Sequence, residues 1–306
     1  MGKLYVITGG AGFVGHALCC ALLEAGDSVR ILDRRAAASP FWPHPRCQRI
    51  ALESLNVPDV RRAMAAADGC FHLATEAPAV LAAASAERVP VVLASSAAVY
   101  GRQGDEAVRE DAPLAPQTPY GLEKLAAETA ARAAHRAEGL PALCLRFFNI
   151  YGPGQIASRP LSGVVAKYLS ALAAGRLLEV EGDGGQKRDF LFVDDAVAFL
   201  RAAMAWLRAT GGYAELNACT GQPVTILELA GIAMRVAQRR SDLSYAPART
   251  DGIRWSYGSP DAARSLLGVS ARVGLEDGLR LTWLAPAPGP VAVDPAPGQA
   301  RESPRR

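Results

Sequence analysis

Three side chains with the chemistry of a proton-transfer site lie close together in the sequence. Ser96 closes an apolar run at residues 91–96, Tyr120 follows 24 residues later, and Lys124 stands four residues beyond Tyr120. Thr118 and the proline after it suit the N-cap and first turn of a helix, which places Tyr120 and Lys124 on one helical face. With four lysines and eight tyrosines in the chain, such a pair is expected by chance about 0.1 times.

The spacing of this trio predicts a defined reaction. The Tyr120 phenol is a poor base at neutral pH, and lowering its pKa by ~3 units requires about 4 kcal/mol of preferential stabilisation of the phenolate. The Lys124 ammonium and a positively charged nicotinamide ring would supply much of that stabilisation. Ser96 would hold a substrate hydroxyl for deprotonation by Tyr120 while hydride leaves the same carbon.

A glycine-rich turn supplies the expected dinucleotide site. The segment TGGAGFVG at residues 8–15 follows a strand-like run and opens a helix, so that a pyrophosphate would lie on the N–H groups at the helix start. The next strand ends in Asp33, whose carboxylate would accept hydrogen bonds from the adenosine ribose and repel a 2′-phosphate. This favours NAD; Arg34 and Arg35, which could attract that phosphate, keep NADP as the alternative. The expected cofactor-binding residues in the turn are Gly9, Gly12, Phe13, Val14 and Gly15.

The elements that must position these residues alternate between strand and helix. Strand-like runs occur at 4–8, 28–32, 70–73, 91–96 and 142–147, and helical stretches occur at 14–25, 60–67 and 120–137. Such alternation predicts βαβ units in a doubly wound parallel α/β sheet, the Rossmann arrangement. We expect an NAD-binding domain at 1–151, a smaller C-terminal α+β substrate domain at 152–284 and a disordered Ala/Pro/Gly-rich tail at 285–306.

Composition excludes several other classes of protein. The 306 residues are 50% hydrophobic with a formal net charge of +3, and the basic residues form no stripe of the kind that binds nucleic acid. The six cysteines show no C-x-x-C pair, so neither a metal site nor a disulfide framework is expected. No apolar run is long enough to span a membrane, and no signal peptide precedes the first strand. We therefore expect a cytoplasmic protein.

The motifs together resemble those of the NAD-dependent epimerase/dehydratase family, a group of extended short-chain dehydrogenases/reductases that act on nucleotide sugars. The residues that carry the resemblance are TGGAGFVG at 8–15, Asp33, FHLA at 71–74, SSAAVYG at 95–101, PYGLEK at 119–124, RFFNIYGPG at 146–154 and RDFLFVDD at 188–195.

The resemblance implies roles for particular positions. Ser96, Tyr120 and Lys124 would be the catalytic trio, Lys124 also binding the cofactor and Ser96 the substrate. Leu73 and Glu53 would join the glycines and Asp33 around NAD. Asn149, Arg188 and Arg249 would bind the diphosphate of a nucleotide sugar, for which guanidinium groups are well suited. A homodimer is also left open by the resemblance.

The form SSAAVYG favours one reaction over others in the family. Members that resemble 4,6-dehydratases have an Asp-Glu pair where this chain has Ala97-Ala98, so dehydration is disfavoured. The pattern resembles that of UDP-glucose 4-epimerases, which pass through a transient 4-keto sugar. The alternative is a ketoreductase or dehydrogenase of nucleotide sugars, which could use the same three catalytic residues.

One segment departs from the resemblance. Only 17 residues separate Leu73 from Val91, where similar proteins have several tens. We expect residues 80–85 to be the remnant of a helix, too short for a normal βαβ crossover. A protein that binds the dinucleotide without catalysis is therefore the second hypothesis.

Overall fold

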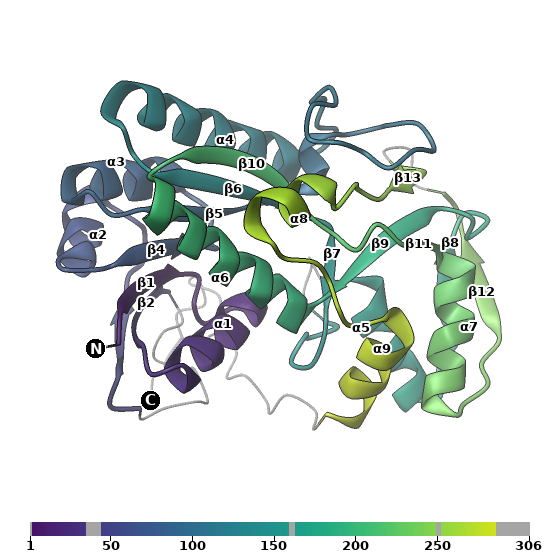
Figure 1. Ribbon diagram of the computed structural model, residues 1–306. Coiled ribbons are helices and arrows are strands. Elements are labelled where there is room, and N and C mark those ends of the chain that lie inside the picture. Colours follow the sequence, from purple (N-terminus) through teal and green to yellow (C-terminus); the bar gives the residue numbers. More distant parts are fainter. Residues whose placement is uncertain (1, 35–43, 159–162, 249–251, 286–306) are drawn as a thin grey trace, which may run out of the picture.

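The computed structural model describes residues 2–34, 44–158, 163–248 and 252–285 of the chain. Its centre is a seven-stranded, fully parallel sheet in the order β10-β6-β5-β4-β1-β2-β3 (Figure 1). The strands are β1 (Leu4–Thr8), β2 (Ser28–Asp33), β3 (Cys47–Ala51), β4 (Gly69–His72), β5 (Val91–Ser96), β6 (Ala142–Phe147) and β10 (Tyr213–Ala218). The predicted α/β fold with a Rossmann sheet is confirmed.

Helices cover both faces of this sheet because its central strands are apolar on both sides. Strands β4 and β6 are buried along their whole length. On one face lie α2 (Val57–Met64), α3 (Ala77–Glu87) and α4 (Pro119–Glu138), and on the other lie α1 (Phe13–Glu24) and α6 (Val193–Thr210). Each face has its own hydrophobic cluster, so the sheet is the middle of three layers.

The order of the strands fixes where a ligand can bind. Strand β1 has β2 on one side and β4 on the other, so the chain winds away from β1 in both directions. The loops that follow β1 and β4 therefore separate at their carboxyl ends and leave a crevice, which is the usual ligand site of doubly wound sheets. The glycine turn after β1 and Leu73 after β4 lie at this crevice.

The C-terminal part contains two smaller sheets. One joins β7 (Asn149–Tyr151), β9 (Lys187–Phe192), β11 (Pro223–Thr225) and β13 (Trp255–Ser256), and the other joins β8 (Leu178–Glu181) to β12 (Leu243–Ala246). Helices α5 (Val164–Ala173), α7 (Ile226–Ala237) and α9 (Leu275–Leu284) pack around them, and α8 (Asp261–Leu267) packs against α6 and β10. Figure 1 shows this part beside the carboxyl ends of the large sheet.

The strand pairing crosses the predicted boundary at residue 152. After β9 the chain returns to the large sheet. Helix α6 covers one face of that sheet, and β10 forms its edge strand beside β6. Leu216 and Ala218 of β10 are buried in the same cluster as the core of the large sheet. Residues 193–218 therefore belong to the Rossmann layer, and the smaller part is built from segments on either side of them.

The prediction that the segment before β5 is too short for a crossover was wrong. It forms the complete helix α3 of 11 residues and joins β4 to β5 as parallel neighbours. Left-handed residues at both ends, Glu76 and Arg88, start and stop the helix within short connections. Helix α3 packs against α2 and α4, so the abbreviated segment still completes the layer.

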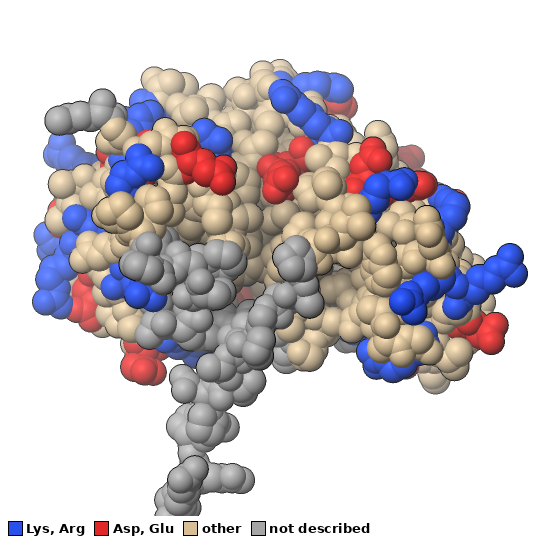
Figure 2. Space-filling model, turned by 90° about the horizontal axis from the view of Figure 1, so that it is seen from below, with Lys and Arg blue, Asp and Glu red and all other residues tan. Residues whose placement is uncertain are grey.

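Two further observations concern the surface. Within the described residues, no helix is long and apolar enough to cross a membrane. Basic and acidic side chains are interspersed over the face seen in Figure 2. Apart from Ala285, the predicted tail lies outside the described residues.

Candidate active site

The glycine turn between β1 and α1 leaves the start of the helix accessible to an anion. Gly9 has a φ of +71°, and its N–H donates to the Leu32 carbonyl at 2.9 Å. A Cβ on Gly15 would lie 2.4 Å from the Gly9 carbonyl oxygen, so only glycine lets the first turn of α1 come this close to the loop. The N-cap, Gly12, has no side-chain hydrogen bond, and the first turn contains no acidic residue.

These residues fit a dinucleotide. The uncapped helix start offers backbone N–H groups and the positive end of the helix dipole to a pyrophosphate. Asp33, at the end of β2, accepts a hydrogen bond from the Ala11 N–H at 3.1 Å. Its carboxylate is therefore anchored against the glycine turn, where the adenosine ribose of NAD is expected. Phe13 and Val14 turn their side chains into the hydrophobic clusters on either side of α1.

Leu73 also reaches this site, whereas nothing ties Glu53 to it. The Leu73 N–H donates to the Thr8 carbonyl at 3.1 Å, and a Cβ on Gly9 would lie 3.1 Å from the Leu73 carbonyl carbon. Glu53 is exposed in the bend that follows β3, with no described contact to the glycine turn. Its predicted role near the adenine stays a prediction. Arg34 is exposed beside Asp33, and Arg35 lies outside the described residues.

The expected trio comes together at the carboxyl end of β5. Thr118 caps α4 by accepting from the Gly121 N–H at 3.1 Å, which starts the helix at Pro119 as predicted. A Cβ on Gly121 would lie 2.7 Å from the Ala98 carbonyl oxygen, so the glycine allows α4 to approach the segment after Ser96. The Lys124 Nζ lies 5.7 Å from the centre of the Tyr120 ring.

The electrostatics of the trio show what the protein alone provides. Partial burial raises the pKa of Tyr120, whereas the neighbouring Ser96 hydroxyl lowers it. Lys124 is 6% exposed and donates to the Ala94 carbonyl at 2.9 Å. Burial lowers the pKa of Lys124, because desolvation disfavours its charged form. Tyr120 is thus a neutral phenol at neutral pH in the protein alone.

His72 lies beneath the trio as a buried neutral residue. Its Nδ1 is 2.7 Å from the Thr8 Oγ1, and it is 2% exposed. Burial, reinforced by the charge of Lys124, lowers the pKa of His72 to about 3. The imidazole is therefore uncharged at neutral pH and joins the ends of β1 and β4 beneath the glycine turn.

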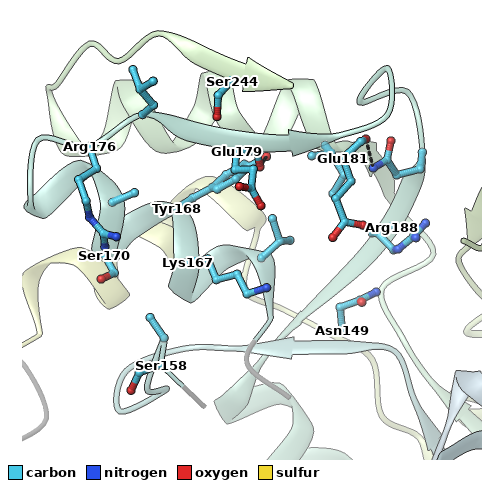
Figure 3. Close-up of a pocket in the computed structure, with 16 residues that line it drawn as sticks. Asn149, Ser158, Lys167, Tyr168, Ser170, Arg176, Glu179, Glu181, Arg188 and Ser244 are labelled. Carbon is cyan, nitrogen blue, oxygen red and sulfur yellow. Dashed lines mark hydrogen bonds between the residues drawn. The ribbon is translucent and has the colours of Figure 1, made fainter. Parts of the chain in front are cut away.

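A cavity of about 810 Å³ lies in the C-terminal part, and Figure 3 shows the side chains that line it. Asn149 and Arg188 lie at one end and Arg176 at the other, with Lys167 between them. Glu179 and Glu181 also face the cavity from β8. Its walls thus combine cations that suit a diphosphate with carboxylates that accept hydrogen bonds.

Two of the three residues predicted to bind the diphosphate, Asn149 and Arg188, line this cavity. The Asn149 Nδ2 donates to the Asp189 carbonyl at 2.9 Å, and the Arg188 Nη2 donates to the Ile253 carbonyl at 2.7 Å. These hydrogen bonds hold both side chains at the cavity wall. Among the described residues, the trio is not part of the lining of this cavity. Arg249 lies outside the described residues.

Sequence reasoning missed several residues of the cavity and of the support beneath the trio. Lys167, Tyr168 and Glu181 come from α5 and β8, and no local motif distinguishes them from solvated surface residues. Glu128 did carry a signal, because it follows Lys124 by four residues on the same face of α4. A second charge on a face that must pack against a sheet is unusual.

Comparisons with known proteins agree with this geometry. Residues 5–86 and 77–219 match the NAD dependent epimerase/dehydratase family. The UDP-glucose 4-epimerase of Mycolicibacterium smegmatis is 28% identical over 90% of this chain and 96% of its own.

Solved structures share the fold as well. MoeE5 in complex with UDP-glucuronic acid and NAD is 30% identical, with a TM-score of 0.80 over 91% of this chain and 97% of that chain. The UDP-glucose 4-epimerase of Thermotoga maritima with UDP-glucose is 25% identical, with a TM-score of 0.85 over 91% of this chain and 97% of that one.

Proposed function

Because the chain belongs to the NAD dependent epimerase/dehydratase family, we propose that it inverts C4 of a hexose carried on a nucleoside diphosphate. The observation that supports this proposal is the presence of three parts in one chain. The catalytic trio lies at the carboxyl end of β5, the glycine turn lies at the neighbouring crevice, and Asn149 and Arg188 line a cavity in the C-terminal part. UDP-glucose is the first substrate to assay, since the similar epimerases are named for it.

NAD, held by the glycine turn and Asp33, would supply the means to take a hydride from C4 and return it. The residues of this chain handle the proton. The Ser96 hydroxyl would hold the C4 hydroxyl, and Tyr120 would take its proton. Burial raises the pKa of Tyr120 in the free protein, so the positive charge of the cofactor, with that of Lys124, would make proton removal possible only in the assembled complex.

Inversion also requires the 4-keto sugar to present its other face. Arg188 and Asn149 would hold the diphosphate while the hexose turns, so that the substrate stays bound during the exchange. Tyr120 would then return the proton to the C4 oxygen. Ala97 and Ala98 follow Ser96 in the short helix η2 (Ala97–Val99), and neither can act as an acid for loss of water.

The test is an assay of C4 inversion with UDP-, dTDP-, GDP- and ADP-hexoses, followed by NMR in D₂O. We expect inversion with retention of the C4 hydrogen, because the hydride never exchanges with solvent. Tyr120→Phe should lower turnover by about 10²- to 10⁴-fold, whereas Tyr245→Phe, a residue that is 61% exposed on β12, should leave it unchanged.

Each alternative has its own outcome in the same experiment. If the protein reduces a 4-keto sugar with NADH and does not invert C4 of any hexose, it is a ketoreductase rather than an epimerase. Binding of NAD without any Tyr120-dependent hydride transfer would leave a dinucleotide-binding protein and refute the proposal.

A further inference from the structure

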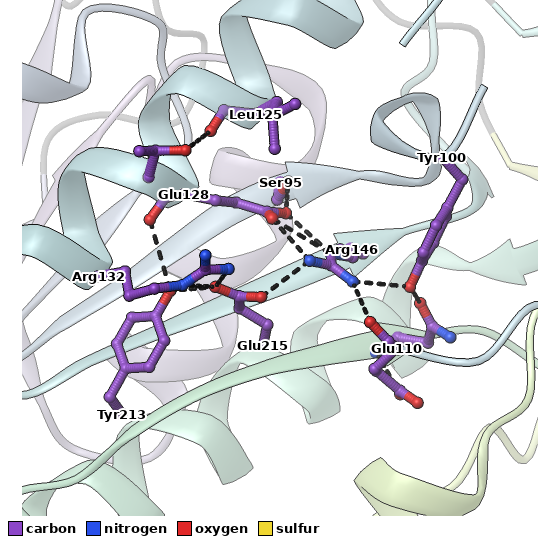
Figure 4. A network of polar contacts seen from close by, with 11 residues as sticks. Ser95, Tyr100, Glu110, Leu125, Glu128, Arg132, Arg146, Tyr213 and Glu215 are labelled. Atoms are coloured by element: carbon purple, nitrogen blue, oxygen red, sulfur yellow. Dashed lines mark hydrogen bonds and ion pairs between the residues drawn. The ribbon is translucent and has the colours of Figure 1, made fainter. Parts of the chain in front are cut away.

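A buried polar network joins α4 to the strands β5, β6 and β10 (Figure 4). Arg146 on β6 is 1% exposed and pairs with Glu128 on α4, which is fully buried, at 2.8 Å. The same guanidinium contacts Glu215 on β10 at 2.9 Å and donates to the Tyr100 hydroxyl at 3.0 Å. We call these residues, with Ser95, the Arg146 network.

The network touches the two elements that carry the catalytic trio. The Ser95 hydroxyl donates to the Glu128 carboxylate at 2.5 Å, one residue before Ser96. Four residues earlier on α4, the Lys124 Nζ donates to the Ala94 carbonyl at 2.9 Å. Two consecutive turns of one helical face are thus hydrogen-bonded to consecutive residues of β5.

Tyr120 is only partly enclosed by its own surroundings. Its side chain is 39% exposed at the start of α4, and the next residue but one, Leu122, is 57% exposed. The distance from Tyr120 to Ser96 therefore depends both on the close approach of Gly121 to the Ala98 carbonyl and on how the buried face of α4 is held further along. A fully buried ion pair is seldom the most stable way to fill a core, so its use here points to a requirement for defined geometry.

We propose that Ser95 and Glu128 are positioning residues, which fix α4 against β5 so that Tyr120 meets Ser96 and the substrate hydroxyl. Arg146 holds the Glu128 carboxylate in the orientation that accepts from Ser95. The inference rests on the proposed function for its kinetic consequence, but the geometric part concerns only the position of Tyr120.

The test compares two variants that each remove one hydroxyl, one from the Arg146 network and one from Tyr213, which is not a member of that network. Ser95→Ala deletes the contact between β5 and α4. Tyr213→Phe is the matched control, because the Tyr213 hydroxyl bonds to Glu215 and to the backbone of Glu128 at the side away from β5. We expect Ser95→Ala to lower kcat about 10-fold or more with KM within about 2-fold, because small misplacements of catalytic groups cost rate. Tyr213→Phe should change neither.

A second readout does not require turnover. In protein labelled with ¹³C-tyrosine, the Tyr120 Cζ resonance is assigned by its loss in Tyr120→Phe. We expect it to shift in Ser95→Ala and to stay in place in Tyr213→Phe. If the wild type turns over no sugar, the proposed function fails while this spectrum still decides the positioning role. An unmoved Tyr120 resonance, or equal losses of kcat in the two variants, would overturn the inference.

Discussion

Substitution of Gly15 by alanine should weaken NAD binding through a contact that the structure defines. The new Cβ would lie 2.4 Å from the Gly9 carbonyl oxygen and 2.7 Å from the Gly10 Cα. An ordinary contact needs about 3.4 Å, so the start of α1 must move away from the loop by roughly 1 Å. Both contacted atoms belong to the backbone, which cannot turn aside as a side chain can.

The magnitude follows from two opposing terms. Overpacking of this kind costs about 1–3 kcal/mol, whereas alanine is favoured over glycine in a helix by about 1 kcal/mol. The net loss of stability at Gly15 should therefore be about 0–2 kcal/mol. The displaced N–H groups are those expected to meet the pyrophosphate, so the whole steric term of about 1–3 kcal/mol should appear in NAD binding, as roughly a 5- to 150-fold weaker Kd.

The assay is isothermal titration of NAD into the variant, with thermal unfolding measured in parallel. Gly231→Ala is the matched control, since Gly231 lies inside α7 and a Cβ there would meet nothing within 4 Å. That variant should gain up to about 1 kcal/mol from helix propensity and bind NAD as the wild type does. Unchanged NAD affinity in a folded Gly15→Ala protein would refute the assignment of the glycine turn to the cofactor.

Three further outcomes follow from the same site. Tyr120→Phe should lower kcat by about 10²- to 10⁴-fold, the usual contribution of a positioned base, while titration shows NAD binding unchanged; a loss below tenfold would contradict the role. Arg188→Met should raise KM for the nucleotide sugar by about 10- to 100-fold in steady-state assays, because a charge-assisted contact to the diphosphate is lost, and an unchanged KM would place the diphosphate elsewhere. The pKa of His72 is about 3 in the fold and about 6.5 when unfolded, so its neutral form stabilises the protein above pH 6.5 and this contribution is lost as the pH falls toward 3. Urea unfolding should therefore show the wild type losing about 2 kcal/mol more than His72→Asn between pH 6.5 and 4.5, and parallel curves would contradict the burial of a neutral imidazole.

The parts of the site that sequence alone predicted are those set by local chemistry. The glycine turn needs a short distance between neighbouring backbone segments, and the pairing of Tyr120 with Lys124 needs only one turn of a helix. Strand β5 was predicted with its observed bounds, because its apolar run has clear ends. Each of these signals lies within a few residues of the feature that it predicts.

The parts that were not predicted depend on residues far apart in the chain. Strand β10 reads as an ordinary short strand, and only its pairing with β6 shows that the chain returns to the large sheet. The error about α3 has a different cause, since the minimum length of a crossover depends on how sharply the helix can start and stop. Glu76 and Arg88 have left-handed backbone conformations. Neither residue type commonly adopts this conformation, so the sequence does not predict these turns.

Strand β10 also links the two ends of the candidate site. Beyond its last residue, the Thr220 and Gly221 N–H groups each donate to the Asp189 carboxylate at 2.9 Å. Asp189 in turn presents its carbonyl to the Asn149 amide at 2.9 Å and directly follows Arg188. Burial raises the pKa of Asp189, and these donors offset part of that shift because they stabilise the carboxylate. Glu215, which pairs with Arg146, lies on β10 itself. One strand therefore connects the residues expected to hold the diphosphate with those proposed to position Tyr120.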